Sequence, residues 1–388
     1  MEKTPLLQKP PQTLSAVDHE RLVFLTDSFR VYDAANGKLK VYSGPYGIHF
    51  GNTPNNTTID GNLVYQASQD GLLALSLTTG NVQFARYFSH GYSSVSACYP
   101  IIEGDRLYQC FYNYSGSDLY CIDKHTGDTI WQTRSNLGGY TDDFFPTTDH
   151  TSQNIIVSGI DGPTCFSKAT GQLVWKDHSS PGYARLSPKV CTDKWVLFYS
   201  GRRRALYALD AGNGSLLWTT DLSPFGIDHT RNPYYHDNTI YLTCACGGSA
   251  QDDMTILAFD TSTGLLVNQY MYPSAIRPAG YHDRYFYVFE SPTFLRSTTR
   301  LSKHLLSDGT TLWSKTLAGQ IGHGIVTTPR FIYCTSSDTP ATPDTGTMNV
   351  LDQSTGNLVR QYPVHTDHNA APVVVDGQGR AWYPHPHF

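Results

Sequence analysis

The stretch FGIDHTRNPYYHD, residues 225 to 237, combines residue types that enzymes use for proton transfer and for anion binding. His229 and Arg231 stand shortly before Pro233, and Tyr234 follows it. An imidazole titrates near neutral pH, and a guanidinium can stabilise an oxyanion. Comparable residues precede other prolines of the chain, so their chemistry depends on whether the fold gathers them.

Similar segments end at prolines along the whole sequence: GIHFGNTP, GGYTDDFFP, GYARLSP, GQIGHGIVTTP and HTDHNAAP. Each carries His, Asp or Arg shortly before the proline. The candidate catalytic residues are His49, Asp142, His229, His323 and His368. The candidate substrate-binding residues are Tyr140, Phe144, Tyr183, Arg185, Arg231, Tyr234 and Arg277.

These segments separate the copies of a repeat, which appears in versions such as CIDKHTGDTIW, FSKATGQLVW, ALDAGNGSLLW and VLDQSTGNLVR. Its glycines are 43 to 50 residues apart: Gly37, Gly80, Gly127, Gly171, Gly214, Gly264, Gly309 and Gly356. This period, with several short strand patterns per unit, is typical of β-propeller blades. We predict an all-β propeller of eight four-stranded antiparallel blades, with residues 1–388 as one domain and 1–12 as an extended arm. A seven-bladed ring would require one copy to be excluded.

The turn chemistry of the repeat predicts how the blades meet. Thr-Gly or Asn-Gly supplies the positive φ of a tight hairpin. An aromatic residue often follows four residues later, and we expect its ring to pack between neighbouring blades. These aromatic residues are Phe84, Trp131, Trp175, Trp218 and Trp313. The final pattern AAPVVVDGQGRAWY has no blade of its own, so we expect it to complete the blade begun by RLVFLTDSFRVYDAANGKLKVY.

The strand order of a blade, A to D from axis to rim, separates two faces. The A–B and C–D turns share one face, here called the turn face, and they are short throughout. The B–C loops and the links between blades share the other, here called the link face. Three consecutive B–C connections are long, namely CGGSAQDD, SPTFLRSTTRLS and SSDTPATPDTGT. Function concentrates in long loops on rigid scaffolds.

We therefore place the candidate site beside the axis on the link face, where the links of all blades converge. The alternative is that polar link residues only satisfy backbone groups near a water-filled channel. His150, His236 and His282 fall at A–B turns of the opposite face and are expected to be solvated.

Composition narrows the choice of partners. The net charge is −5 and no basic block stands out, so nucleic acid is not an expected partner. The longest apolar runs are strand-sized, so no membrane partner is expected. The N-terminal MEKTPLLQKPPQTL lacks the apolar stretch of a secretory signal, and the eight cysteines lie mostly in strand-like runs. Both observations favour buried thiols in a reducing, cytoplasmic setting.

Three kinds of chemistry remain open for the axial residues. The first is acid–base catalysis on a small molecule without a cofactor. The second is a zinc, manganese or iron site built from His49, His229, His323 and His368. The third is a non-catalytic scaffold or ligand-binding propeller, and the scaffold version allows for a protein partner.

The pattern A-x-D-x-x-T-G-x-x-x-W, seen in LYALDAGNGSLLW and LYCIDKHTGDTIW, resembles the repeat of pyrroloquinoline-quinone-like β-propellers and covers nearly the whole chain. The quinone-dependent dehydrogenases of that group carry an adjacent cysteine pair that this sequence lacks. In size, missing signal and pocket character the chain is also broadly similar to fungal propeller hetero-Diels–Alderases of tropolone–sesquiterpenoid biosynthesis. That resemblance implies a dehydration followed by cyclisation. A carbohydrate lyase that uses His and Arg is the next alternative.

Overall fold

A computed structural model describes most of the repeat and part of the links. The described residues are 21–25, 29–43, 57–67, 71–88, 96–98, 100–113, 116–135, 147–159, 162–177, 186–200, 203–225, 227–246, 254–272, 276–290, 298–321, 325–337, 346–364, 373–375 and 381–382. They form β-strands and one short 3-10 helix, η2 (Ser223–Phe225), with no α-helix among them. Within these residues no helix is long and apolar enough to cross a membrane.

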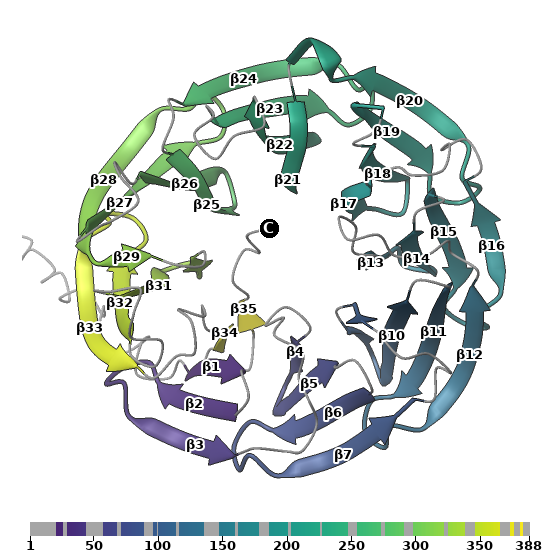
Figure 1. Ribbon diagram of the computed structural model, residues 1–388, viewed down its shortest axis with the longest axis horizontal. Coiled ribbons are helices and arrows are strands. Elements are labelled where there is room, and N and C mark those ends of the chain that lie inside the picture. Colours follow the sequence, from purple (N-terminus) through teal and green to yellow (C-terminus); the bar gives the residue numbers. More distant parts are fainter. Residues whose placement is uncertain are drawn as a thin grey trace, which may run out of the picture.

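The strands form eight antiparallel sheets arranged as a ring around one axis, so the chain is an eight-bladed β-propeller (Figure 1). This confirms the predicted fold class and excludes the seven-bladed alternative. Each blade contributes one innermost strand near the axis and one outermost strand at the rim. Consecutive blades are consecutive in the sequence, as the repeat predicts.

The first four blades contain the following strands. Blade 1 contains β1 (Arg21–Leu25), β2 (Phe29–Asp33), β3 (Leu39–Ser43), β34 (Val373–Val375) and β35 (Ala381–Trp382). Blade 2 contains β4 (Thr57–Asp60), β5 (Leu63–Ala67), β6 (Gly71–Ser76) and β7 (Val82–Tyr87). Blade 3 contains β8 (Ser96–Ala97), β9 (Ile101–Glu103), β10 (Arg106–Asn113), β11 (Gly116–Asp123) and β12 (Thr129–Ser135). Blade 4 contains β13 (Thr147–His150), β14 (Asn154–Gly159), β15 (Gly162–Ser167) and β16 (Leu173–Lys176).

The second four follow the same plan. Blade 5 contains β17 (Leu186–Cys191), β18 (Trp195–Ser200), β19 (Ala205–Asp210) and β20 (Leu216–Asp221). Blade 6 contains β21 (Ile227–His236), β22 (Thr239–Cys246), β23 (Met254–Asp260) and β24 (Leu266–Tyr272). Blade 7 contains β25 (Ile276–His282), β26 (Tyr285–Glu290), β27 (Thr298–Leu305) and β28 (Thr311–Ala318). Blade 8 contains β29 (Gln320–Ile321), β30 (Val326–Thr327), β31 (Phe331–Ser337), β32 (Gly346–Asp352) and β33 (Leu358–Val364).

The two ends of the chain meet in blade 1 and close the ring. Strand β34 pairs antiparallel with β1, with Val373 opposite Val23 and Val375 opposite Arg21. The N-terminal segment therefore supplies the three outer strands of this blade, and the C-terminal segment supplies the inner ones. The predicted closure is confirmed.

The hydrophobic core lies between the blades. Eight clusters of buried side chains each draw on two neighbouring blades, one cluster per blade–blade interface. Strand alternation explains this pattern, because successive side chains of a strand point to the two faces of its sheet. Each blade thus packs against a neighbour on both faces, and burial of apolar surface drives ring assembly.

The repeat glycines hold the blades at their contact distance. All eight adopt a left-handed backbone, with φ between +69° and +75°. A Cβ at Gly171 would lie 2.5 Å from the Trp131 ring of the preceding blade, and one at Gly264 would lie 2.4 Å from the Trp218 ring. Glycine is therefore required for two reasons, the backbone conformation and the ring that covers it. This confirms that the aromatic residues pack between blades.

The same rings donate hydrogen bonds to the next blade. Each indole N–H reaches the carbonyl of a residue in the following C–D turn: Trp131 to Lys168 (3.1 Å), Trp175 to Ala211 (2.9 Å), Trp218 to Thr261 (2.9 Å) and Trp313 to Gln353 (3.3 Å). Tyrosines take this role at two other interfaces: Tyr270 bonds Leu306 (2.5 Å) and Tyr362 bonds Ala34 (3.0 Å).

The strand bounds confirm that the link face carries the long B–C connections. The B–C connections of blades 6, 7 and 8 span residues 247–253, 291–297 and 338–345. In the other blades the corresponding gaps are short, as at 114–115 and 160–161. The link face is thus the elaborated one.

The glycine–ring contact generates a stability prediction. Gly264→Ala should cost about 1–2 kcal/mol for the left-handed backbone and about 1–3 kcal/mol more because the Trp218 ring must move. Gly61→Ala is the matched control, since Gly61 has φ +57° but nothing within 4 Å of the added Cβ. Urea denaturation measures both costs. Equal costs for the two variants would contradict the proposed role of the ring.

Candidate functional site

Three of the predicted site residues lie in the halves of innermost strands that are nearer the link face. His229 and Arg231 lie in the first half of β21, opposite Ala245 and Thr243 of β22. Arg277 is the second residue of β25, opposite Phe289. The side chains of these three residues lie outside the described part of the structure.

The other predicted residues lie wholly outside the described residues, except for Tyr234. They are His49, Tyr140, Asp142, Phe144, Tyr183, Arg185, His323 and His368. Their places in the chain are nevertheless bounded by described strands. Arg185 directly precedes β17, and Phe144 stands three residues before β13. Their convergence at the axis and their roles stay predictions.

Tyr234 lies near the turn-face end of β21, where it contacts the next blade. Its ring stacks on Tyr281 with centroids 4.9 Å apart, and its hydroxyl donates to the Asp283 carbonyl at 2.9 Å. Burial raises the pKa of Tyr234 to about 12, so the phenol stays protonated at neutral pH. These contacts give Tyr234 a packing role between blades 6 and 7.

The histidines expected at the A–B turns are found there. His150 ends β13, His236 ends β21 and His282 ends β25. His150 is exposed, and His236 lies 3.3 Å from the Asp237 carboxylate. His282 is only half-buried, yet desolvation lowers its pKa.

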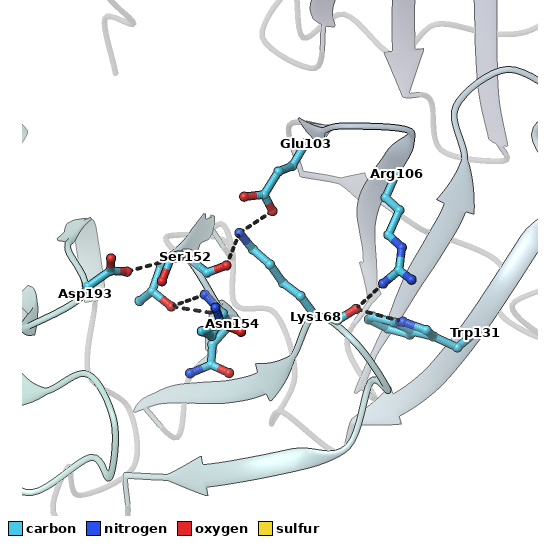
Figure 2. A network of polar contacts seen from close by, with 9 residues as sticks. Glu103, Arg106, Trp131, Ser152, Asn154, Lys168 and Asp193 are labelled. Carbon is cyan, nitrogen blue, oxygen red and sulfur yellow. Dashed lines mark hydrogen bonds and ion pairs between the residues drawn. The ribbon is translucent and has the colours of Figure 1, made fainter.

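A polar network on the turn face joins blades 3, 4 and 5 (Figure 2). The Lys168 ammonium lies 2.5 Å from the Glu103 carboxylate of blade 3 and 3.4 Å from the Ser152 carbonyl. The Ser152 N–H donates to Asp193 of blade 5 at 2.5 Å, and this bond lowers the pKa of that carboxyl. An analogous ion pair joins Lys124 and Asp60, 2.7 Å apart, between blades 3 and 2.

Lys168 is nearly fully buried, whereas Glu103 is about half exposed. A buried ammonium is tolerated because it is paired and hydrogen-bonded. The Lys168 carbonyl accepts from Arg106 and from the indole of Trp131, and its ammonium pairs with Glu103, so Lys168 joins blade 4 to blade 3.

A second buried lysine lies between blades 7 and 8. The Lys303 ammonium donates to the Gln353 carbonyl at 3.0 Å and to its amide oxygen at 3.1 Å. It also lies 3.6 Å from the centroid of the Tyr285 ring, a cation–π contact. The amide N–H of Gln353 donates in turn to the Tyr287 hydroxyl at 2.9 Å. Burial, followed by the nearby Arg284 charge, lowers the pKa of Lys303 to about 8.

His304, the next residue, is also buried. Its ring stacks on Phe286 at 4.9 Å and meets the Tyr272 edge at 5.3 Å. Its Nδ1 lies 3.2 Å from the Thr311 hydroxyl, while Nε2 is buried without a hydrogen-bond partner among the described residues. Burial lowers the pKa of His304, because the charged form would be poorly solvated there.

Sequence reasoning did not single out Lys168, Lys303 or His304. Each stands in or beside an ordinary strand C, just before a C–D turn. The available signal for Lys168 was a charged residue where other copies have Ala34, Leu77 or Thr261, and for Lys303 a charged residue where other copies have Val31, Ala74 or Ala258.

No metal cluster occurs in the described part of the chain, where no three His, Cys, Asp or Glu side chains lie close enough to hold an ion. The four histidines of the metal alternative are not among the side chains described. Of the seven cysteines whose side chains are described, all but the half-buried Cys191 are buried. Burial raises the pKa of Cys121 to about 11 and of Cys165 to about 12, which makes both thiols poor ligands and poor nucleophiles.

Comparison with known proteins supports the fold. The family model of the outer membrane protein assembly factor BamB matches residues 163–274, from the outer half of blade 4 through blade 6. No curated protein matches the chain at a significant level.

Solved propellers resemble the chain at low identity. The computationally designed protein Ika8 has a TM-score of 0.60 at 16% identity, covering 85% of this chain and 95% of that one. BamB from Moraxella catarrhalis has a TM-score of 0.52 at 15% identity, covering 84% and 95%. The dihydro-heme d1 dehydrogenase NirN has a TM-score of 0.59 at 13% identity, covering 94% and 76%. At these identities the likeness concerns the fold alone.

The buried lysine generates a pH prediction. Between pH 8 and the unfolded pKa near 10.5, the unfolded chain binds the proton that folded Lys303 has released, so folding becomes more favourable as pH rises. Wild type should therefore gain about 1–2 kcal/mol relative to Lys303→Met between pH 7.5 and about 9.5. Urea denaturation at both pH values measures the difference. A difference that does not change with pH would show that the pKa of Lys303 is not depressed.

Proposed function

We propose that the chain is an enzyme that binds a small, partly apolar organic molecule at the axis on the link face. The supporting observation is topological. The inner strands of the blades begin at this face around one axis, and three consecutive blades carry long loops there. His229, Arg231 and Arg277 lie in the first halves of two such strands.

The contacts described on the turn face argue against a substrate site there, and so support a site on the link face. There, Lys168, Lys303 and Tyr234 are engaged in contacts between blades. A group that is fully hydrogen-bonded and packed is poorly placed to bind a substrate. The link face is the other place where His and Arg recur in several blades.

In this proposal His229 and His368 are the principal acid–base pair, and His323, His49 and Asp142 assist them. One protonated imidazole donates a proton to a leaving hydroxyl, and a neutral imidazole accepts a proton from the neighbouring atom, so that one water is released. Arg185, Arg231 and Arg277 would stabilise developing negative charge.

The unsaturated product then adds to a second partner held in a near-attack pose, which needs no further proton transfer. Aromatic residues of the links, Tyr140, Phe144 and Tyr183, would provide apolar walls for both partners. This is the hetero-Diels–Alderase-like dehydration and cyclisation that the sequence resemblance implies. No bound cofactor takes part in it, and the enzyme would act in the cytoplasm.

The test is turnover of a panel of aromatic and terpenoid alcohols, followed by mass spectrometry for the loss of one water. His229→Ala and His368→Ala should each lower turnover by about 10²–10⁴-fold, the usual contribution of a general acid or base. His125→Ala is the matched control, because His125 is an exposed turn-face residue paired with Asp105 at 3.2 Å.

All three variants should unfold at nearly the wild-type temperature. Unchanged turnover in the two axial variants, or an equal loss in His125→Ala, would refute the proposed acid–base site.

The metal-dependent alternative predicts that the purified protein contains a bound metal ion. Elemental analysis by plasma mass spectrometry should find no stoichiometric zinc, manganese or iron if the site is cofactor-independent. Near-stoichiometric metal that is lost in a His229→Ala/His368→Ala double variant would refute cofactor independence and favour a metal-dependent lyase.

A second candidate function is a non-catalytic scaffold, which the match of residues 163–274 to the BamB family model favours. A scaffold would keep its partner binding in the same axial variants, because its partner would be recognised by surface loops. The two functions are therefore separated by whether His229→Ala abolishes an activity or leaves binding intact.

A further inference from the structure

Blade 3 places two cysteines opposite each other at the axial edge of its sheet. Strand β8 pairs antiparallel with β10, with Ala97 opposite Phe111. One residue further, the Cys98 N–H donates to the Cys110 carbonyl at 2.9 Å, so this hydrogen bond continues the register to the two cysteines. In the strand registers of the described residues, every other cysteine faces a residue of another type.

The two side chains belong to one buried cluster between blades 3 and 4, which also contains Cys121. Cys98 is 5% exposed and Cys110 is fully buried. Opposite residues of a hydrogen-bonded antiparallel pair have Cα atoms about 5.5 Å apart, which is a common Cα separation for a disulfide. Cys121 stands opposite Tyr108 of the same neighbouring strand, so the register gives it no cysteine partner.

The innermost strand of blade 3 is interrupted at this pair. Strand β8 ends at Ala97, and β9, which continues the pairing with β10, begins at Ile101. The buried Gln109 amide donates to the Cys98 carbonyl at 2.9 Å and to the Cys110 carbonyl at 3.0 Å, in place of a regular ladder. A short, irregular edge strand opens locally at a lower free energy than the strands behind it. A small reagent therefore reaches Cys98 before Cys110.

We propose that Cys98 and Cys110 form a modification site, at which a low-molecular-weight disulfide oxidises the two thiols to a cross-strand disulfide. The Cys98 thiolate attacks the reagent, releases one reduced small thiol and becomes a mixed disulfide. The Cys110 thiolate then attacks the Cys98 sulfur and releases the second small thiol. The two protein thiols are oxidised, the reagent is reduced, and the two protons end on the released thiols.

The new bond would tie the innermost strand of blade 3 to the strand behind it. The link between blades 2 and 3 enters β8, so the bond would fix the strand to which this link leads. In a reducing setting the disulfide would form when the oxidised fraction of the small thiols rises, and it would be reduced when that fraction falls. This inference is independent of the function of the axial site.

The test is treatment of the purified full chain with oxidised glutathione, followed by alkylation in denaturant and trypsin digestion without reduction. Trypsin leaves Cys98 in residues 87–106, and Cys110 together with Cys121 in residues 107–124. One disulfide should join the two peptides, with Cys121 alkylated. Dithiothreitol should separate them.

Cys121 is the matched internal control, because its separation in sequence from Cys110 is almost that between Cys98 and Cys110. In urea, the Cys98–Cys110 and Cys110–Cys121 disulfides should form in similar amounts, since the entropy of loop closure depends on that separation. In the folded chain the Cys98–Cys110 disulfide should exceed the other at least about 10-fold, because disulfide formation requires a specific geometry.

Three variants test the order of attack. Cys121→Ser should keep the cross-link between the two peptides. Cys110→Ser should lose it and accumulate glutathione on Cys98. Cys98→Ser should lose it too, but with Cys110 left mostly reduced, because Cys110 lies on the strand behind. Circular dichroism verifies that each variant is folded.

Equal amounts of the Cys98–Cys110 and Cys110–Cys121 disulfides in the folded chain would overturn the proposal. So would a wild type in which glutathione stays attached to Cys98, or one in which both thiols stay reduced. The comparison of the two disulfides in wild type needs no substitution, so it decides the proposal even where a buried serine unfolds the chain.

Discussion

The contact between an aromatic ring and a left-handed glycine of the next blade is the constraint on which the ring of blades depends. The glycine lets the C–D turn close tightly and leaves no Cβ between turn and ring, as at Gly214 beneath Trp175. The indole N–H then satisfies a turn carbonyl that would otherwise face an apolar ring. The contact fixes how closely two blades approach, and it recurs at most of the interfaces around the axis.

This constraint gives the turn face and the link face different roles. The C–D turns must stay short to receive the rings, and buried lysines such as Lys168 and Lys303 join blades beside them. The turn face is therefore occupied by structural contacts. The link face is not bound by the same geometry, and blades 6 to 8 carry their long B–C loops there. Variation is tolerated where it does not alter the spacing of the blades, which is why function is better sought on that face.

The sequence was sufficient for the fold because the repeat carries its own turn chemistry, and every repeat glycine has the positive φ that Thr-Gly or Asn-Gly indicates. Three interfaces escaped the pattern, because Val41, Asn268 and Arg360 stand where an aromatic residue is expected. Val41 packs against the core between blades 1 and 2. At the other two interfaces Tyr270 and Tyr362, two residues later, supply the ring. Residues two apart in a strand share a face, so the substitution is physically simple yet invisible to fixed spacing. The ion pair of Lys168 and Glu103 could not be predicted, because it joins residues far apart in sequence and has no counterpart in most copies. The axial residues stand in links whose conformation the repeat does not dictate.

The seam in blade 1 has a consequence for how the protein is made. Val23 pairs with Val373, so the outer strands of this blade leave the ribosome first and their inner partner leaves last. Until then, Leu22 and Val23 belong to a sheet without its axial strand, and the two interfaces that flank it are incomplete. Closing so long a loop costs little more entropy than closing half of it, about 0.6 kcal/mol per doubling. Closure of blade 1 is therefore limited by the time needed to synthesise β34, and not by the time the two segments need to find each other. During translation the ring of blades stays open, with blade 1 incomplete.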